Sequence, residues 1–379
     1  MEHYLDNAAT TRVCAAAVDA AVEAMTRGFG NPSSRHGAGA DAAKALAGHR
    51  KVIADALGAK VEEVVFTSCG TESDNWAIRG AAWLGRRRGK HIITTAIEHD
   101  AVLQPCRELE RAGWEVTYLK PDRTGIVRAE QVAEALREDT VLVSMMLVNN
   151  ELGTIQPVAE VAKLLKSKKS VALLHCDAVQ GFLKVPFTVK GLGVDLLSIS
   201  GHKVHAPKGI GAMYIRSGIK LPPMVLGGHQ ENDLRSGTEP TAQIAAFAAA
   251  VAQGLEQQQA HLAHLRELKA YALEKLTGEV DGLSLLVEGE APHILAVTLE
   301  GYKSEVVVRF LSDRGICISS GSACHKGKPS HVFAALTLPK KQMDGALRVS
   351  FSHETTKEDI DALTEGLKAA RQQLFASLS

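Results

Sequence analysis

The stretch Ser198-Ile199-Ser200-Gly201-His202-Lys203 decides how this sequence is interpreted. An apolar run from Val194 to Leu197 leads into it, and a second apolar run, from Gly211 to Ile215, follows. Two apolar runs separated by glycine and polar residues are typical of buried strands joined by a turn. We therefore expect Lys203 to project from a turn between two strands.

A lysine in such a turn has a possible chemical role. The hydroxyl and imidazole groups before Lys203 can bind a phosphate, and a desolvated ammonium beside that anion can lose its proton and become a nucleophile. A lysine that carries pyridoxal phosphate as a Schiff base needs these properties. An exposed lysine in a glycine-rich hairpin is the alternative, since short motifs also match by chance.

Composition narrows the classes of function. The 379 residues include 43 basic and 43 acidic side chains, so no broad surface of one sign is available for nucleic acid or an anionic membrane. No apolar window is long enough to span a bilayer, and the acidic start of the chain is unlike a signal peptide. We expect a cytoplasmic protein whose partner is a small molecule or another protein.

The cysteines form neither a CxxC pair nor a zinc-binding spacing, so we expect no disulfide framework and no structural metal. They are Cys14, Cys69, Cys106, Cys176, Cys317 and Cys324.

The period of the apolar residues alternates between that of strands and that of helices over the first two thirds of the chain. This alternation predicts parallel βαβ units, with a mostly apolar sheet between layers of helices. The expected strands are 64–66, 91–95, 116–119, 141–148 and 171–176, and the expected helices are 14–25, 40–57, 71–83, 101–112, 129–136 and 158–165.

The last third of the sequence has a different pattern. One long helix is expected over 241–276, and we place a domain boundary inside it. Residues 1–255 would form a large cofactor-binding domain and 256–379 a smaller α+β domain, with the first residues, up to about position 15, packed on the smaller one. The expected elements of the smaller domain are strands 283–286, 294–299 and 347–351 and helices 304–313 and 357–379.

Polar clusters directly follow the expected strands. Because ligands of parallel sheets bind beyond the carboxyl ends of the strands, these clusters are candidate site residues. They are Thr67 to Ser73, Glu98-His99, Asn149 to Glu151, and Asp177 with Gln180.

Three of these clusters each have a functional and a structural interpretation. Gly70 and Thr71 open a helix whose free N–H groups can bind phosphate, but Thr71 could equally cap that helix, with Asp74 following. Asp177 ends a buried strand and needs a cation, either a protonated pyridine nitrogen or a core arginine or lysine. His99 could stack on a ring and move protons, although a satisfied core histidine is the default.

Taken in order, these segments resemble the NifS/IscS-like cysteine desulfurases, which belong to the class V aminotransferases. The matching motifs run from Leu5-Asp6-Asn7-Ala8-Ala9-Thr10-Thr11 to about Phe351 and include Val-Asn-Asn-Glu-Leu-Gly, His-x-Asp-Ala-x-Gln, Ser-Gly-His-Lys and Arg-Ser-Gly-Thr. The resemblance implies a fold-type I pyridoxal phosphate enzyme with a mainly parallel seven-stranded sheet between helices and a smaller C-terminal α+β domain.

The resemblance also implies a role for each matching residue. Lys203 would bind the cofactor covalently and shuttle protons, Asp177 would pair with the ring nitrogen, and His99 would stack on the ring as acid or base. Gln180 and Asn150 would lie near the ring's phenolic oxygen. The phosphate would be bound by Gly70, Thr71, Ser200 and His202, and by Thr238 from the other subunit of a homodimer.

Two further residues would handle the substrate. Arg348, with Asn150, would bind the α-carboxylate of L-cysteine, because a guanidinium binds carboxylates through two hydrogen bonds. An arginine in a surface ion pair is the alternative. Cys324 lies among small residues, followed by Gly327-Lys328-Pro329, which predicts a mobile loop, and nearby basic side chains favour the thiolate. It would take the sulfur as a persulfide and could transiently ligate an iron–sulfur cluster.

The implied activity is that of a cysteine desulfurase, which releases L-alanine and passes sulfur to an acceptor protein. Iron–sulfur cluster assembly is the first expectation for the pathway, and tRNA thiolation or another thio-cofactor pathway is the alternative. A selenocysteine lyase, a sulfinate-specific enzyme or a carrier without catalysis are the competing interpretations. The segment Gly227 to Asp233 and a Cys324 loop about two residues shorter depart from the IscS pattern.

Overall fold

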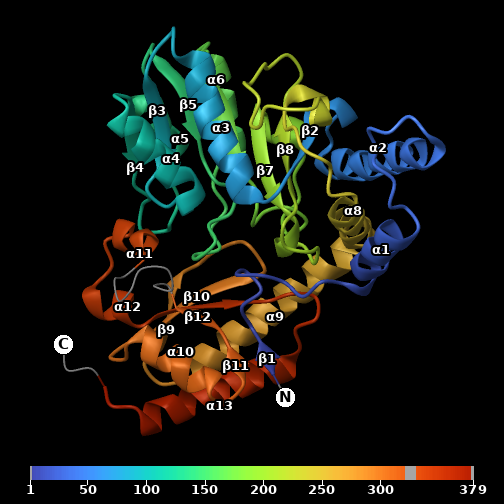
Figure 1. Ribbon diagram of the computed structural model, residues 1–379. Coiled ribbons are helices and arrows are strands. Elements are labelled where there is room, and N and C mark those ends of the chain that lie inside the picture. Colours follow the sequence, from blue (N-terminus) through green and yellow to red (C-terminus); the bar gives the residue numbers. More distant parts are fainter. Residues whose placement is uncertain (1, 321–329, 377–379) are drawn as a thin grey trace.

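The computed structural model describes residues 2–320 and 330–376. A seven-stranded sheet forms its larger part, in the order β2-β8-β7-β6-β5-β3-β4 (Figure 1). Only β8 runs antiparallel to its neighbours, so the predicted mainly parallel α/β sheet is confirmed. The strands are β2 (Val64–Thr67), β3 (His91–Thr95), β4 (Glu115–Leu119), β5 (Thr140–Ser144), β6 (Leu173–Asp177), β7 (Leu196–Ser200) and β8 (Gly211–Ile215).

Helices cover both faces of this sheet because the strands are apolar on both sides. On one face α3 (Gly70–Gly85) and α4 (Asp100–Arg111) bury Trp76 and Val102. The opposite face has a larger core, formed with α1 (Ala15–Thr26), α2 (Gly37–Leu57), α5 (Ala129–Ala135), α6 (Val158–Ser167), α7 (Val189–Leu192) and α8 (Thr241–Glu256).

The strand expected over 141–148 is shorter than predicted, since β5 ends at Ser144. The apolar residues that follow, Met145 to Val148, are buried but leave the regular ladder. Two backbone bonds still hold them beside β6, from Met145 N–H to His175 and from Leu147 N–H to Asp177. These residues are therefore apolar because they are buried, and not because they belong to a strand.

A second, four-stranded antiparallel sheet has the order β12-β13-β10-β9. It packs against α9, α10 and α13 through a separate core. The start of the chain joins this part, because β1 (His3–Tyr4) pairs with β11 (Ile316–Cys317) and Leu5 belongs to the same core. The elements are β9 (Leu283–Val287), β10 (Ile294–Leu299), β12 (Ser319–Ser320), β13 (Ala346–Ser350), α9 (Gln258–Glu279), α10 (Ser304–Ser312) and α13 (Lys357–Gln373).

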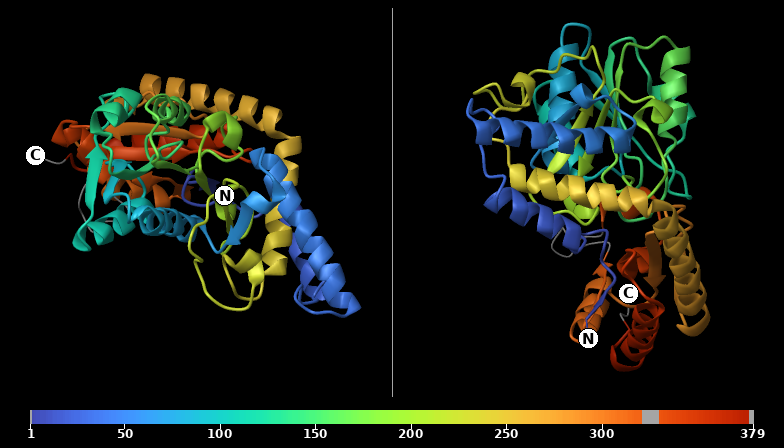
Figure 2. Two further views of the ribbon diagram at one scale, coloured as in Figure 1. Left: turned by 90° about the horizontal axis from the view of Figure 1, so that it is seen from above. Right: turned by 90° about the vertical axis from the view of Figure 1, so that its right-hand side faces the viewer.

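The single helix expected over 241–276 is wrong. The chain breaks at Gln257, whose φ of −102° and ψ of 4° are not helical. Figure 2 shows that α8 and α9 point in different directions. The physical reason is that α8 buries its apolar side in the core of the large sheet, whereas α9 buries its own in the second core. The predicted domain boundary after residue 255 stays a prediction.

Short elements complete the described chain, in which no helix has the length and apolarity needed to cross a bilayer. These elements are η1 (Val61–Glu63), η2 (Gly201–Lys203), η3 (Gln230–Asp233), α11 (His331–Ala335) and α12 (Lys340–Asp344).

Candidate active site

One cavity of about 450 Å³ lies between the carboxyl ends of the large sheet's strands and the edge of the small sheet. It brings together most of the predicted site residues, from segments far apart in the sequence. Those that line it are Gly70, Thr71, His99, Asn150, Asp177, Gln180, Ser200, His202, Lys203 and Arg348. Thr238 is exposed and does not line it. Cys324 lies outside the described residues.

Lys203 occupies the predicted position, at the end of η2 between β7 and β8. Its Nζ donates to the carbonyls of Ala8 and Ala9, both at 2.7 Å. Burial lowers the pKa of Lys203 to about 8, and the positive charge of Arg348 acts in the same direction. About a tenth of this amine is therefore neutral and nucleophilic at pH 7, far more than for an ordinary lysine.

The first turn of α3 forms a seat for an anion beside Ser200. A Cβ on Gly70 would come within 2.7 Å of Val179 Cγ2, so only glycine lets the helix approach this closely. The Ser200 hydroxyl is buried and has no hydrogen-bond partner in the described chain. A phosphate placed here would meet both this hydroxyl and the N–H groups of the helix.

The capping interpretation of Thr71 is wrong. The helix begins one residue earlier than predicted, at Gly70, and its N-cap is Cys69, whose side chain makes no capping hydrogen bond. Cys69 instead lines the cavity. Asp74, which was expected to accompany the cap, is buried within α3.

Asp177 is the last residue of β6 and is only 5% exposed. It accepts the Val179 N–H at 2.9 Å, but no ion-pair partner is found for it within residues 2–320 and 330–376. The predicted alternative, a salt bridge to a core arginine or lysine, is therefore wrong for this part of the chain. Burial raises the pKa of Asp177, while the positive charges of His99 and Lys203 act against that shift. A cation arriving in the cavity would relieve the cost of its charge.

His99, His202 and Gln180 complete the wall around Lys203. His99 caps α4, where its Nδ1 accepts the Ala101 N–H at 3.1 Å. It is an exposed residue rather than a satisfied core histidine. Gln180 donates to the Ala8 carbonyl at 2.8 Å. Burial lowers the pKa of His202 to about 4, with the charge of Lys203 acting in the same direction, so its ring is neutral at pH 7 before an anion binds.

Arg348 projects from β13 of the small sheet into the same cavity. Its Nη2 donates to Asp6 Oδ1 at 2.8 Å and to Ser319 Oγ at 3.1 Å, and its Nη1 donates to the Asn150 carbonyl at 2.9 Å. The Nε is buried without a partner among the described atoms. The surface interpretation is wrong, since Arg348 is 8% exposed, but an ion pair is present.

Sequence reasoning assigned no role to three acidic residues near this site. Asp6 pairs with Arg348. Glu98 is fully buried with its pKa raised to about 8 by that burial, and Glu151 lines the cavity with its pKa raised to about 7 for the same reason. All three lie in motifs that carried the resemblance, which was the available signal.

The cavity fits pyridoxal phosphate. The Ser200 hydroxyl lies beside the N-terminus of α3 without a hydrogen-bond partner among the described residues. The buried Asp177 carboxylate has no cation there, and the Lys203 amine, with its lowered pKa, lines the same cavity. These are the groups that would hold the phosphate, the ring nitrogen and the aldehyde carbon of this cofactor.

Comparison with known proteins agrees with this chemistry. The family described as Aminotransferase class-V matches residues 3–363. A cysteine desulfurase IscS from Methanosarcina thermophila is 42% identical over 381 residues, covering 98% of this chain and 92% of that protein.

Solved structures give the same result. One described as a NifS-like protein superposes with a TM-score of 0.93 at 35% identity, covering 99% of this chain and 100% of the other. Another, SspA in complex with cysteine, has a TM-score of 0.81 at 36% identity and covers 94% and 100% of the two chains. With near-complete coverage by both sequence and structure, this chain belongs to the cysteine desulfurases of the class V aminotransferase family.

Proposed function

We propose that this protein removes the sulfur atom of L-cysteine, releasing L-alanine and leaving a persulfide on Cys324. The observation that carries the proposal is the meeting of Lys203, Asp177 and Arg348 in one cavity. A proton-accepting amine, a partner for a cationic ring and a receptor for a carboxylate are the groups that this reaction requires.

Pyridoxal phosphate, the cofactor of this family, supplies an electron-withdrawing ring that stabilises negative charge on the substrate Cα. Its phosphate would be held by Ser200, His202 and the N-terminal turn of α3 with Gly70 and Thr71. Asp177 would hold the ring nitrogen, and His99, Gln180 and Asn150 would line the ring.

Lys203 would remove the proton from the substrate Cα and later return a proton. Its pKa of about 8 keeps both protonation states accessible near neutral pH, which suits a group that accepts and donates in one cycle. His99, at the N-terminus of α4, would transfer protons to or from the substrate sulfur or amine. Arg348 would fix the carboxylate and so orient the substrate toward Lys203.

The sulfur step is balanced without an external oxidant. The Cys324 thiolate attacks the substrate sulfur, a sulfur–sulfur bond forms, and the bond between that sulfur and the substrate Cβ breaks. The electron pair stays with the carbon, and Cβ takes up one proton to become the methyl group of L-alanine. Cys324 lies outside the described residues, so this assignment rests on the sequence.

Replacing Cys324 with alanine tests this assignment. The Cys324→Ala variant is expected to keep the visible absorbance of the bound cofactor but to stop the formation of alanine from L-cysteine. Cys317→Ala, in strand β11, is the matched control and should keep wild-type activity. Alanine formation by Cys324→Ala at the wild-type rate would refute the role of Cys324.

Substrate choice within the family is tested by turnover. We expect L-cysteine to be processed faster than L-selenocysteine or L-cysteine sulfinate. A higher kcat/KM for selenocysteine would assign the protein as a selenocysteine lyase instead.

We also propose a homodimer in which Thr238 reaches the phosphate of the other subunit. Its support is the exposure of Thr238 together with an apolar stripe on α1, where Val18, Val22 and Met25 are 47%, 49% and 59% exposed. Patches of this kind mark protein interfaces. Sedimentation of Val22→Lys as a monomer, beside a dimeric wild type, is the expected result. A monomeric wild-type holoenzyme would contradict the proposal.

The acceptor of the sulfur is proposed to be a cytoplasmic protein of iron–sulfur cluster assembly. Thiolation of tRNA is the alternative pathway. After loading with L-cysteine, trapping mixed disulfides between Cys324 and cellular proteins would distinguish the two. Recovery of a tRNA-modifying enzyme instead of a cluster scaffold would favour the alternative.

A further inference from the structure

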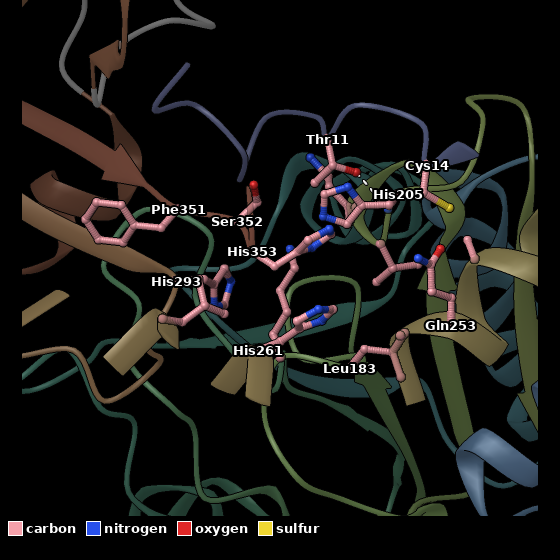
Figure 3. A pocket seen from close by; sticks show the side chains of 16 residues that line it. Thr11, Cys14, Leu183, His205, Gln253, His261, His293, Phe351, Ser352 and His353 are labelled. Atoms are coloured by element: carbon pink, nitrogen blue, oxygen red, sulfur yellow. Dashed lines mark hydrogen bonds between the residues drawn. The ribbon is translucent and has the colours of Figure 1, made fainter. Parts of the chain in front are cut away.

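A second cavity, shown in Figure 3, is also lined by Lys203 but otherwise has walls different from those of the proposed active site. It holds about 60 Å³ in which the centre of a water-sized sphere can lie, which is several times what one water molecule needs. Among the residues that the structure describes, only Lys203 lines both cavities. The walls come from α8 and α9 and from the segments around Cys14, Lys184 and His353.

Lys184 supplies this cavity with an ammonium that lacks a counter-ion. In the described chain its Nζ makes a single hydrogen bond, a long one of 3.4 Å to Gln180 Oε1. The residues that line the cavity include no aspartate or glutamate. Burial lowers the pKa of Lys184 to about 7, and the charges of Lys203 and Arg348 add to this effect. Buried charges are normally paired, so an anion is the missing component.

A row of imidazoles forms one side of the cavity. His353 lies 4.3 Å from the ring of His205 and 4.3 Å from the ring of His261, and Figure 3 shows the three side by side. His205 Nδ1 lies 2.9 Å from the Arg12 carbonyl, which can only accept a hydrogen bond, so this nitrogen carries the proton. The opposite nitrogen of His205 is then a base.

His293 is fully buried and contributes a second unused base. Its Nε2 is 3.3 Å from Gln180 Oε1 and donates to it, which leaves Nδ1 as an acceptor with no partner in the described structure. Burial lowers the pKa of all four histidines, and the charge of Lys184 contributes to the shifts of His205 and His293. They are therefore neutral at pH 7 and do not themselves attract an anion. The groups that can are the ammonium of Lys184 and, while it is not bonded to the cofactor, that of Lys203.

The remaining walls are apolar. Leu183, Ala250, Leu265 and Phe351 contribute aliphatic or aromatic surface around the polar groups. An inorganic oxyanion would leave this surface unused and lose its own hydration on all sides. A molecule with a carboxylate at one end and a short hydrocarbon part at the other matches both kinds of wall.

We propose that this cavity binds a small aliphatic carboxylate whose anionic end pairs with the Lys184 ammonium. Arg348 does not line this cavity, so the ligand occupies a site separate from the proposed carboxylate receptor. The inference does not depend on the proposed desulfurase reaction.

Binding must be linked to protons. A neighbouring anion favours the charged form of Lys184, so above pH 7 the protein takes up a proton as the ligand enters. The other titratable groups that face this space are Cys14, Lys203, His205, His261, His293 and His353, with Arg348 acting from farther away. None of these side chains carries a carboxylate that could already pair with Lys184.

Calorimetric titration of the holoenzyme with sodium propionate tests the proposal. We expect propionate to bind at least ten-fold more tightly at pH 6.5 than at pH 8.5. Titrations at pH 8 in two buffers of different ionisation enthalpy should show net proton uptake. Propionamide, which has the same shape without the charge, should not bind.

Two variants separate this cavity from the active site. Lys184→Met removes the ammonium, and Ala250→Leu fills the apolar wall while keeping Lys184; each should weaken propionate binding at least ten-fold, although Arg348 is intact. His49→Ala, at a half-buried histidine of α2 outside the cavity, should bind as the wild type does. Undiminished binding by Ala250→Leu, or binding without proton uptake, would overturn the proposal.

Discussion

Replacing Asp6 with asparagine is expected to strengthen the binding of L-cysteine. Any carboxylate that pairs with a guanidinium through two parallel hydrogen bonds needs one N–H from each of two nitrogens, and on Arg348 both such pairs include Nη2. Its two N–H groups are directed at Asp6 and Ser319. The substrate must therefore displace one of them, and Asp6 is the charged competitor.

The magnitude follows from the exposure of the ion pair. The side chains of Arg348 and Asp6 are 10% and 19% exposed, so their hydrogen bond is only partly screened by solvent. A hydrogen bond between charged groups contributes about 1.5–3 kcal/mol, and the lower value suits this partial exposure. Loss of about 1.5 kcal/mol of competition corresponds to a KM for L-cysteine roughly ten-fold lower.

The assay is the formation of alanine by the holoenzyme over a range of L-cysteine concentrations. Asp6→Asn should lower KM, Ser319→Ala should lower it less because a neutral hydroxyl competes less, and Arg348→Lys should raise it by removing the two-point geometry. Asn150 and Ser319 continue to hold the guanidinium in Asp6→Asn. A KM that rises in Asp6→Asn as much as in Arg348→Lys would refute the reasoning, because Asp6 would then position Arg348 rather than compete for it.

Three further predictions concern stability and cofactor binding. Glu231 is buried and accepts two hydrogen bonds from the Arg50 guanidinium, at 2.5 and 2.7 Å, and one from the Phe66 N–H. Glu231→Gln should therefore lower the free energy of unfolding, measured by urea titration, by about 3 kcal/mol. A loss below about 0.5 kcal/mol would contradict this. Lys184→Met should stabilise the protein in the absence of added carboxylate, because the pKa of Lys184 is about 7 in the folded protein and 10.5 in the unfolded chain. The increase in the free energy of unfolding, at most roughly 5 kcal/mol, is complete below pH 7 and disappears as the pH rises to 10.5. Thermal unfolding at pH 6 and pH 10 checks this, and a gain that grows with pH would exclude the stated cause. Ser200→Ala should raise the dissociation constant of pyridoxal phosphate about ten-fold, because one hydrogen bond to the charged phosphate is lost. Absorbance titration measures this, and an unchanged affinity would show that Ser200 does not bind the phosphate.

Local patterns in the sequence were sufficient for most of the fold. The alternation of strand and helix periods predicted the large sheet, and the polar residues that follow its strands do line one cavity. The pattern failed where burial and regular structure diverge. Met145 to Val148 are apolar because they are buried, although β5 has already ended, and α8 and α9 share one helical period although they face different cores.

By itself the sequence determined the family, the lysine turn and the order of the site residues, because these depend on neighbours within a few positions along the chain. Only the tertiary structure decided which of them meet. Asp6 and Arg348 are 342 positions apart, and Lys184 reaches a cavity walled by α8 and α9. No local period records such contacts, since they arise when two sheets with separate cores close on each other and leave their polar residues facing the space between them.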